Sequence, residues 1–367
     1  MSILKVDTLQ NSVGENLVFG NKNLLINGGM NVWQRSTSTS VSTQTYSTVD
    51  RWKTRVGNQG VFTVSRSTDV PSGQGFGYST KWDCTTADAS PAAGDIIIFE
   101  QRIEGQNLQH LLKGTSSAKK LTISFWIKTN KTGTYICELI DIDNSRNISK
   151  SFTISSSSTW EKVTLTYDGD TTGTLDNDNA FSFAVMIWFG AGSNFTTGTL
   201  QTSWGTVGTN RATGVVNLAD STSNELYITG CQLEVGSKAT DFGFEPFETT
   251  LSKCQRYYET SVNYGLDITT QTVSYQESVD WKVGTYHATE GVHYKVPKRD
   301  EATITLYNPF NSNTTGQVRQ INASNSGAHV SASTRFSRNN WFNINYGSSL
   351  GRTAGYSTYN WKADAEL

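Results

Sequence analysis

The segment Leu121-Thr-Ile123-Ser-Phe125-Trp-Ile127-Lys128 alternates apolar and polar residues with a period of two. Successive side chains of a strand point to opposite faces, so this alternation predicts a β-strand with one buried and one polar face. The same period returns in Val163-Thr-Leu-Thr-Tyr167 and in Phe181-Ser-Phe-Ala-Val-Met-Ile-Trp-Phe189. These segments indicate a mainly β fold.

Shorter strand candidates lie on both sides of these segments, separated by turn residues at fairly regular intervals. Such spacing is typical of an antiparallel sandwich or jelly roll. The candidates are Val61–Ser65, Asp95–Phe99, Tyr135–Ile140, Ser151–Ile154, Val215–Leu218, Leu226–Leu233, Val273–Trp281, Thr303–Tyr307 and Trp341–Tyr346. We therefore expect an antiparallel jelly-roll sandwich, then a short helix and a smaller β-sandwich domain.

The composition of the 367 residues supports this expectation. Hydrophobic residues make up 36% and charged residues 17%, and Ser, Thr, Asn and 32 Gly fill the difference. Ser, Thr, Asn and Gly do not sustain long helices, whereas the aromatic residues, 11% of the chain, favour strands and supply burial.

Two segments have helical spacing. Residues 105–113 carry leucines on one face, with Gly114 placed as a C-cap. Residues 247–259 place Leu251, Cys254 and Tyr258 in one stripe, at the point where the strand pattern changes. We therefore expect three parts: a small segment at 1–22, a jelly-roll sandwich at 23–248, and a junction helix with a distal β domain at 249–367.

Charge and hydropathy exclude several classes of function. The net charge is -2 and no basic stretch is present, which argues against nucleic-acid binding. No apolar run approaches the length that spans a bilayer, so we expect no membrane insertion. The start of the chain has no pattern of a secretory signal. The four cysteines are far apart, so neither a zinc site nor a disulfide framework is expected.

The segment 168–179 contains the densest group of carboxylates. Asp168, Asp170 and Asp176 occupy positions 1, 3 and 9 of a calcium-loop spacing, with Gly173 at position 6. Thr172 and Asn179 depart from that pattern. The same residues also form ordinary polar turns, and we regard a turn as the better interpretation and Ca²⁺ as the alternative.

Two tryptophans occupy the polar faces of their predicted strands. Trp126 shares its face with Thr122 and Ser124, and Trp188 shares its face with Ser182. A flat aromatic ring on a polar face suits stacking against a sugar, while neighbouring polar groups hydrogen-bond the hydroxyls. The alternative is that another subunit or the N-terminal segment covers both rings.

No catalytic pattern stands out. The four histidines are scattered, and neither a nucleophile elbow nor a metal-binding or nucleotide-binding motif is present. Paired carboxylates can hydrolyse glycosides without a sequence signature. Glu245 with Glu248 and Glu277 with Asp280 are candidates, although surface charge explains them more simply. We therefore expect a protein that is not an enzyme.

An ordered set of motifs resembles a family of tailed-bacteriophage virion proteins, mostly described as tail fibres, with a main domain like a carbohydrate-binding jelly roll. The set consists of Asn23-Leu-Leu-Ile-Asn-Gly-Gly-Met-Asn-Val-Trp-Gln-Arg35, Tyr46-Ser-Thr-Val-Asp-Arg-Trp52, Ile228-Thr-Gly-Cys-Gln-Leu-Glu-Val-Gly-Ser-Lys-Ala-Thr-Asp-Phe242, Cys254-Gln-Arg-Tyr-Tyr258 and Trp361-Lys-Ala-Asp-Ala-Glu-Leu367. The start, Ile3-Leu-Lys-Val-Asp-Thr8, also resembles structural proteins of marine and cyanobacterial phages. The family carries no assigned site residues, so none is transferred.

The resemblance implies a virion location and a homotrimer, with Leu251, Cys254 and Tyr258 as one strand of a three-helix junction. The alternative for this stripe is packing against its own sandwich. Residues 1–22 would attach the protein to other virion proteins, and the sandwich would bind host-surface glycan. The rival functions are a purely structural virion protein, such as a head fibre or tail adaptor, a polysaccharide-degrading tailspike, and a bacterial carbohydrate-binding module outside any virus.

Overall fold

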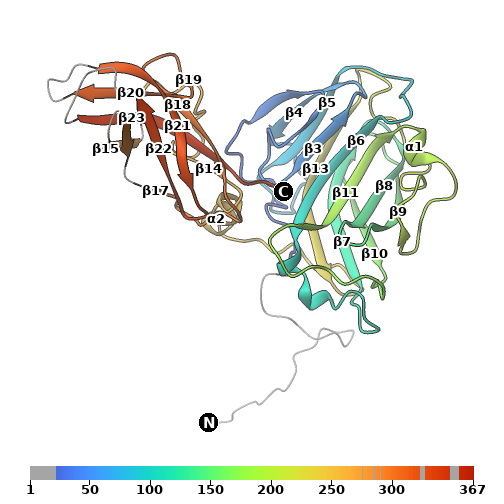
Figure 1. The fold of residues 1–367 in the computed structure, drawn as a ribbon. Helices are drawn as coiled ribbons and strands as arrows, with labels where there is room; N and C mark the ends of the chain where they lie inside the picture. The colour runs from blue at the N-terminus through green and yellow to red at the C-terminus, as the bar shows by residue number, and fades with distance from the viewer. Residues whose placement is uncertain (1–21, 275, 284–285, 290, 323–326, 348–354) are drawn as a thin grey trace, which may run out of the picture.

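The computed structural model describes residues 22–367 except 275, 284–285, 290, 323–326 and 348–354. The chain forms two β-rich domains that meet side by side, with the chain end at 367 lying between them (Figure 1). The expected attachment segment, 1–22, lies almost wholly outside the described residues.

The first domain contains a six-stranded antiparallel sheet with the order β1-β4-β5-β13-β7-β10. Its strands are β1 (Ser38–Val41), β4 (Val61–Ser67), β5 (Ser79–Thr86), β7 (Leu121–Thr129), β10 (Glu161–Tyr167) and β13 (Glu225–Val235).

A seven-stranded antiparallel sheet with the order β12-β9-β8-β11-β6-β3-β2 completes the first domain. Its strands are β2 (Gln44–Thr45), β3 (Lys53–Gly57), β6 (Ile96–Glu104), β8 (Gly133–Asp141), β9 (Arg146–Ile154), β11 (Phe181–Ala191) and β12 (Gly205–Thr206). The predicted strand at Val215–Leu218 is wrong, because these residues lie in a loop and turn.

The core of the first domain lies between these two sheets. The alternating apolar residues of the predicted strands, such as Ile123, Phe125 and Val185, are buried there. Trp82 is fully buried, and its ring meets those of Phe99 and Phe189 edge-on. The antiparallel jelly-roll sandwich expected from the alternation is confirmed.

The predicted helix at 105–113 is wrong. This segment forms two short 3₁₀ turns, η1 (Gly105–Asn107) and η2 (Gln109–Leu111). Leu112 then adopts a left-handed conformation with φ 51°, which an α-helix does not accept. Apart from these turns, the described part of the first domain has one short helix, α1 (Ser193–Thr196).

The junction helix α2 spans Phe247–Gln255 and is shorter than predicted. Tyr258 lies beyond it, in strand β14 (Tyr258–Thr260), which pairs with the last strand of the chain. Cys254 and Tyr258 are both buried within their own chain, and Leu251 is half-buried. The proposed trimer stripe therefore does not exist as an exposed helix face, and packing against the same chain is what the structure has.

The second domain is built around the long strand β23 (Gly355–Asp364). One end of β23 pairs with β15 and β20, and its other end pairs with β14 and β18. The other strands are β15 (Gln276–Val283), β16 (Tyr286–Thr289), β17 (Val292–His293), β18 (Thr303–Asn308), β19 (Thr314–Thr315), β20 (Gln317–Asn322), β21 (Gly327–Ser337) and β22 (Trp341–Gly347). The core of this domain includes Phe342, Ile344 and Trp361.

Buried charges join the two domains. Glu366, which follows β23, accepts hydrogen bonds from Arg51 and Arg35 of the first domain. Asp50 lies on the other side of Arg35, with 3.2 Å between the charged atoms. We call Arg35, Asp50, Arg51 and Glu366 the junction network. Side-chain exposure in this network is 8% or less, so the two domains are fixed to each other by charges that water hardly reaches.

Candidate functional site

The outer face of the six-stranded sheet carries aromatic and charged side chains. Trp126 and Lys128 of β7 point away from the core, and their cross-strand partners on β13 are Thr229 and Tyr227. Trp160, just before β10, reaches over the same face and lies 6.3 Å from the Tyr227 ring, edge to face. Trp126 and Trp160 are half-buried, so each presents part of its ring to solvent.

Hydrogen bonds hold the Trp160 ring in place. Its Nε1 donates to Asp69 Oδ1 over 3.0 Å, and Lys128 pairs with the other oxygen of Asp69. The Lys128 ammonium also lies 4.4 Å from the centre of the Tyr227 ring and 5.7 Å from that of Trp160. Burial acts to raise the pKa of Asp69, but the hydrogen bonds from Lys128 and Trp160 outweigh it and hold that pKa below its usual range.

Lys81 of β5 completes the set on the other side of Tyr227. Its ammonium lies 2.9 Å from Glu225 and 3.3 Å from Asp83. Desolvation acts to lower the pKa of Lys81, but these two carboxylates raise it overall. Both lysines at Tyr227 are thus neutralised by their own chain. We call Asp69, Lys81, Trp126, Lys128, Trp160 and Tyr227 the aromatic face.

The aromatic face offers flat apolar rings beside groups that donate and accept hydrogen bonds. Lys81 and Lys128 are paired with carboxylates of the same chain, and the exposed Lys162 lies opposite Trp126 on β10. A neutral saccharide matches such a surface, since its C–H groups pack on aromatic rings while its hydroxyls bond to the polar rim. The strand alternation predicted the position of Trp126. Trp160 was missed because it stands just before its strand, outside any alternation.

Trp188 does not belong to this surface, and its prediction as a solvent-facing ring is wrong. It lies on the outer face of the other sheet and is fully buried. Its Nε1 donates to Glu138 Oε2 over 2.9 Å, while Phe195 and Arg211, from the segment that follows β11, cover its ring. The covering element comes from the same chain, so Trp188 has no free face for a sugar.

The calcium-loop interpretation of Asp168, Asp170 and Asp176 is not supported by their positions. Asp170 is buried and ion-paired, 2.7 Å from Arg146 and 3.0 Å from Lys113. Asp168 is exposed and pairs with Lys120, and Asp176 is exposed. Within the residues that the structure describes, no cluster of three or more metal-ligating side chains occurs. Two cations already neutralise the carboxylate that would anchor a Ca²⁺ ion.

Asp170→Asn should therefore destabilise the first domain without any involvement of calcium. Burial acts to raise the pKa of Asp170, but hydrogen bonds from Arg146 and Lys113 hold it below its usual value of about 3.9. The carboxylate thus contributes stability above that pH and loses it as the pH falls through the folded-state pKa. We expect a loss of about 1.5–3 kcal/mol at pH 7, measured by chemical denaturation.

The difference between the wild type and Asp170→Asn should shrink as the pH approaches 3. Calcium or a chelator should leave the denaturation midpoints of the wild type and of Asp170→Asn unchanged. Asp176→Asn, at an exposed position in the same segment, is the matched control and should change stability by no more than about 0.5 kcal/mol. A rise in the wild-type midpoint with calcium would restore the metal interpretation.

The motifs that carry the family resemblance form scaffold rather than an open site. The Asn23 side chain donates to Cys231 O over 2.9 Å, and Asn27 bridges Val32 and Asp50. A Cβ atom on Gly28 would lie 1.9 Å from Cys231 O, so only glycine fits there. These contacts tie the loop after residue 22 to β13 and to the junction between the domains.

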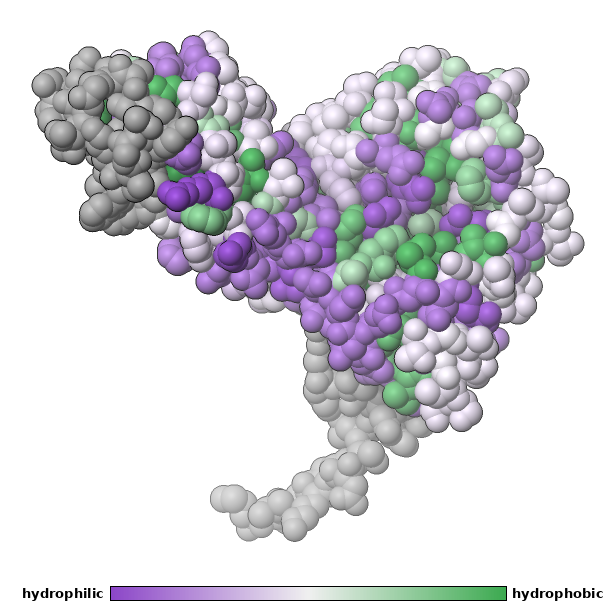
Figure 2. All heavy atoms as spheres, in the orientation of Figure 1, coloured by the Kyte–Doolittle hydropathy of each residue, from purple (hydrophilic) through white to green (hydrophobic). Residues whose placement is uncertain are grey.

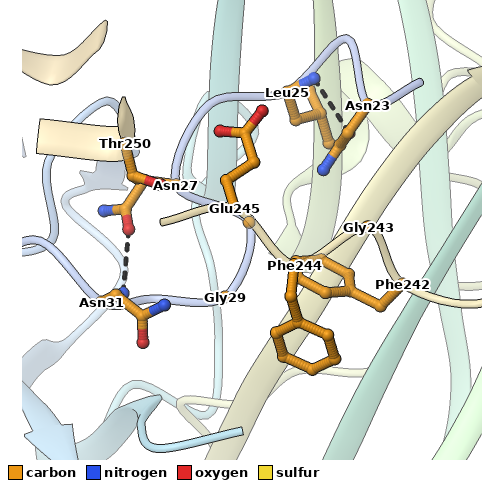
Figure 3. A pocket seen from close by; sticks show the side chains of 11 residues that line it. Asn23, Leu25, Asn27, Gly29, Asn31, Phe242, Gly243, Phe244, Glu245 and Thr250 are labelled. Atoms are coloured by element: carbon orange, nitrogen blue, oxygen red, sulfur yellow. Dashed lines mark hydrogen bonds between the residues drawn. The ribbon is translucent and has the colours of Figure 1, made fainter. Parts of the chain in front are cut away.

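A small pocket lies beside this scaffold, where Asn27 and Asn31 face Glu245 and Phe244 (Figure 3). The backbone N–H of Asn31 donates to Asn27 Oδ1 over 2.8 Å. The pocket has a volume of about 20 Å³, room for roughly one water molecule. It cannot hold a sugar ring.

Of the two carboxylate pairs considered for catalysis, the structure describes the side chains of one, Glu245 and Glu248. Glu245 pairs with Lys253, whereas Glu248 is exposed on α2. The side chains of Glu277 and Asp280 lie outside the described residues. Lys298 and Tyr294, basic and aromatic residues of the second domain, are buried.

No protein family and no curated protein matches the chain. Among solved structures, the enzymatically active domain of tailspike protein 4 from bacteriophage CBA120 shares 15% identity, with a TM-score of 0.31. That match covers 58% of this chain but only 21% of the tailspike chain.

Two further structures are similar to the chain. A putative sugar-binding protein from Bacteroides thetaiotaomicron shares 15% identity over 59% of this chain and 100% of its own, with a TM-score of 0.34. A family 11 carbohydrate-binding module from Clostridium thermocellum shares 12% identity over 55% of this chain and 95% of its own, with a TM-score of 0.27.

Proposed function

We propose that this chain is a tail-fibre protein of a tailed bacteriophage and that it binds glycan on the host surface. The observation that carries the glycan part is the aromatic face, where Trp126 and Trp160 stand half-open beside paired charges. The phage part rests on the ordered motifs between residues 23 and 367. In the described part of the chain, no helix is both long and apolar enough to span a membrane.

An open sheet face implies weak binding at each copy of the site. A sugar on such a face stays partly hydrated, so few of its hydroxyls exchange water for protein. Multivalency turns weak sites into firm attachment, because each binding event raises the effective concentration for the next. We therefore include a homotrimer in the proposal, attached through residues 1–22 to other virion proteins. Sedimentation as a monomer at micromolar concentration would exclude the trimer.

Removing either half-buried ring should weaken glycan binding. Trp126→Ala and Trp160→Ala each remove a ring that can stack on a sugar, and a stacked tryptophan at a binding site contributes roughly 2 kcal/mol. We expect each variant to bind host-cell polysaccharide about 30-fold more weakly. The measurement is surface plasmon resonance with immobilised polysaccharide and the full chain in solution.

Trp126→Phe and Trp341→Ala are the matched controls. Phenylalanine keeps a flat ring, so Trp126→Phe should retain most of the affinity. Trp341 is half-buried in the second domain, and its loss should leave affinity for the polysaccharide unchanged. Wild-type affinity in both Trp126→Ala and Trp160→Ala, with the fold intact by circular dichroism, would refute the proposed site.

Two experiments distinguish the proposed function from rival functions. A purely structural virion protein, such as a head fibre or tail adaptor, would not label host cells when added as fluorescent protein. A polysaccharide-degrading tailspike would release new reducing sugar ends from host polysaccharide. For our proposal we expect labelled cells and no release of sugar ends.

A further inference from the structure

A cleft of about 510 Å³ lies where the two domains meet. One wall comes from Tyr46 and Lys53 of the first domain, and the other from Tyr258, Tyr307 and Lys362 of the second. Hydrophilic residues cover the surface across the junction between the domains (Figure 2). The volume falls within the range of small-ligand sites.

The two lysines of the cleft have no carboxylate partner among the residues that the structure describes, unlike the lysines of the aromatic face. The Lys53 ammonium lies 5.4 Å from the centre of the Tyr46 ring, and that of Lys362 lies 6.0 Å from the centre of the Tyr307 ring. Burial and the neighbouring Arg102 lower the pKa of Lys53, and Glu100, its cross-strand partner, opposes that shift without forming an ion pair. Within the described residues, each domain thus presents one lysine without an ion pair beside a tyrosine ring.

The two acidic residues of the cleft do not pair with its lysines. Asp267 accepts hydrogen bonds from the backbone N–H and the hydroxyl of Thr269, at 2.8 and 2.7 Å. Asp364 lies 3.5 Å from Arg35 and accepts the backbone N–H of Glu366. Neither carboxylate is bound to Lys53 or Lys362, although both line the same cleft. The cleft therefore combines two lysines without ion pairs, the negative charge of Asp267 and aromatic walls.

We infer that this cleft is a second saccharide site, specific for an acidic oligosaccharide of uronic acid units, with carboxylates bound by Lys53 and Lys362. The tyrosine rings would contact the apolar faces of the sugar rings, and the two lysines, one from each domain, would select the acidic sugar over its neutral counterpart. This inference rests on the proposed glycan-binding function but uses a different surface. A ligand held here would touch both domains.

The test compares acidic and neutral trisaccharides that differ at carbon 6. The probes are trigalacturonate against galactotriose and trimannuronate against mannotriose, titrated calorimetrically into the full chain. At least one acidic trisaccharide should bind about tenfold or more tightly than its neutral counterpart, since a bond to a charged group contributes about 1.5–3 kcal/mol. Its affinity should fall with added salt.

Substitutions of the two lysines test whether the acidic trisaccharide binds in the cleft. Lys53→Gln combined with Lys362→Gln should weaken binding of the acidic trisaccharide about tenfold or more, to the level of the neutral one. Lys119→Gln with Lys238→Gln, which removes two exposed positive charges elsewhere, should leave that affinity unchanged. Asp267→Asn should strengthen binding by up to about threefold, a gain that misfolding cannot produce.

The outcomes separate this inference from the proposed function. Equal affinity for acidic and neutral trisaccharides, or no effect of the double lysine substitution, would overturn the acidic cleft. Binding of the acidic probe should persist in Trp126→Ala and Trp160→Ala, because those rings belong to the aromatic face. Suppose that binding of neutral polysaccharide depends on these tryptophans while no acidic probe binds. The proposed glycan-binding function would then be supported, and the acidic-saccharide site in the cleft would be refuted.

Discussion

Arg51→Ala should lower the free energy of unfolding by about 3–5 kcal/mol, since it removes one partner of a buried ion pair. Arg51 is 1% exposed, pairs with Glu366, and donates to Arg102 O over 2.7 Å. Its guanidinium also lies 3.4 Å from the centre of the Tyr257 ring. Loss of the side chain leaves Glu366 with one positive neighbour fewer and opens a cavity where the domains meet. Thermal unfolding followed by calorimetry should show a midpoint lower by roughly 6–20 °C.

Arg335→Ala is the matched control for this prediction. Arg335 is exposed, and its guanidinium lies 5.2 Å from the centre of the Phe336 ring. The wild-type protein therefore has an arginine–aromatic contact at this position that is not buried. Its loss should change the free energy of unfolding by no more than an ordinary surface substitution does, about 0.5 kcal/mol. A loss below about 1 kcal/mol in Arg51→Ala would show that the junction network does not hold the domains together.

Glu259→Gln should destabilise the second domain by a similar amount, about 3–5 kcal/mol at pH 7. The Lys298 ammonium lies 2.7 Å from the Glu259 carboxylate, and both side chains are 0% exposed. Lys298 also donates to Gln255 O over 2.6 Å and to Val296 O over 2.7 Å, which ties the end of α2 to this domain. Without the carboxylate, a buried ammonium remains uncompensated.

The destabilisation of Glu259→Gln should depend on pH in a defined direction. Desolvation already lowers the pKa of Lys298 in the wild type, and the loss of Glu259 should lower it further. Between the folded-state pKa and the ordinary value of about 10.4, the unfolded chain binds the proton that the folded chain has released, so stability rises with pH. Chemical denaturation at pH 7 and pH 9.5 should show that the variant recovers part of its loss at the higher pH.

Glu301→Gln supplies the control for Glu259→Gln. Glu301 is exposed, so the same change of side chain there should alter stability little at either pH. If Glu259→Gln were equally destabilised at pH 7 and pH 9.5, the loss would come from packing or hydrogen bonding rather than from an uncompensated charge on Lys298.

Strand positions could be predicted from alternation in the sequence. The alternation in Leu121–Lys128 matched β7, and that in Phe181–Phe189 matched β11, since core residues recur at every second position. Helical spacing was less informative, because it does not reveal a left-handed residue such as Leu112. The end of α2 was missed for a related reason, since pairing of Tyr258 with β23 outweighs local helical preference.

The candidate site could be predicted only in part. Trp126 and Trp188 have the same sequence signature, a tryptophan on the polar face of an alternating strand. What separates them is Arg211 and Phe195, which come from a later segment and cover one ring only. Local periodicity carries no information about such long-range covering. The cleft between the domains was likewise beyond prediction, because Lys53 and Lys362 are brought together only by the junction.

The order of synthesis on the ribosome gives the junction network a further consequence. Arg51 and Glu366 are 315 positions apart, so at 5–20 residues per second roughly 16–63 s pass between their appearance. During that time the first domain can form its sheets, but Arg51 has not yet met its carboxylate and the surface that will face the second domain stays hydrated. Nascent chains halted before residue 366 should therefore be more sensitive to proteases around Arg51 than completed chains.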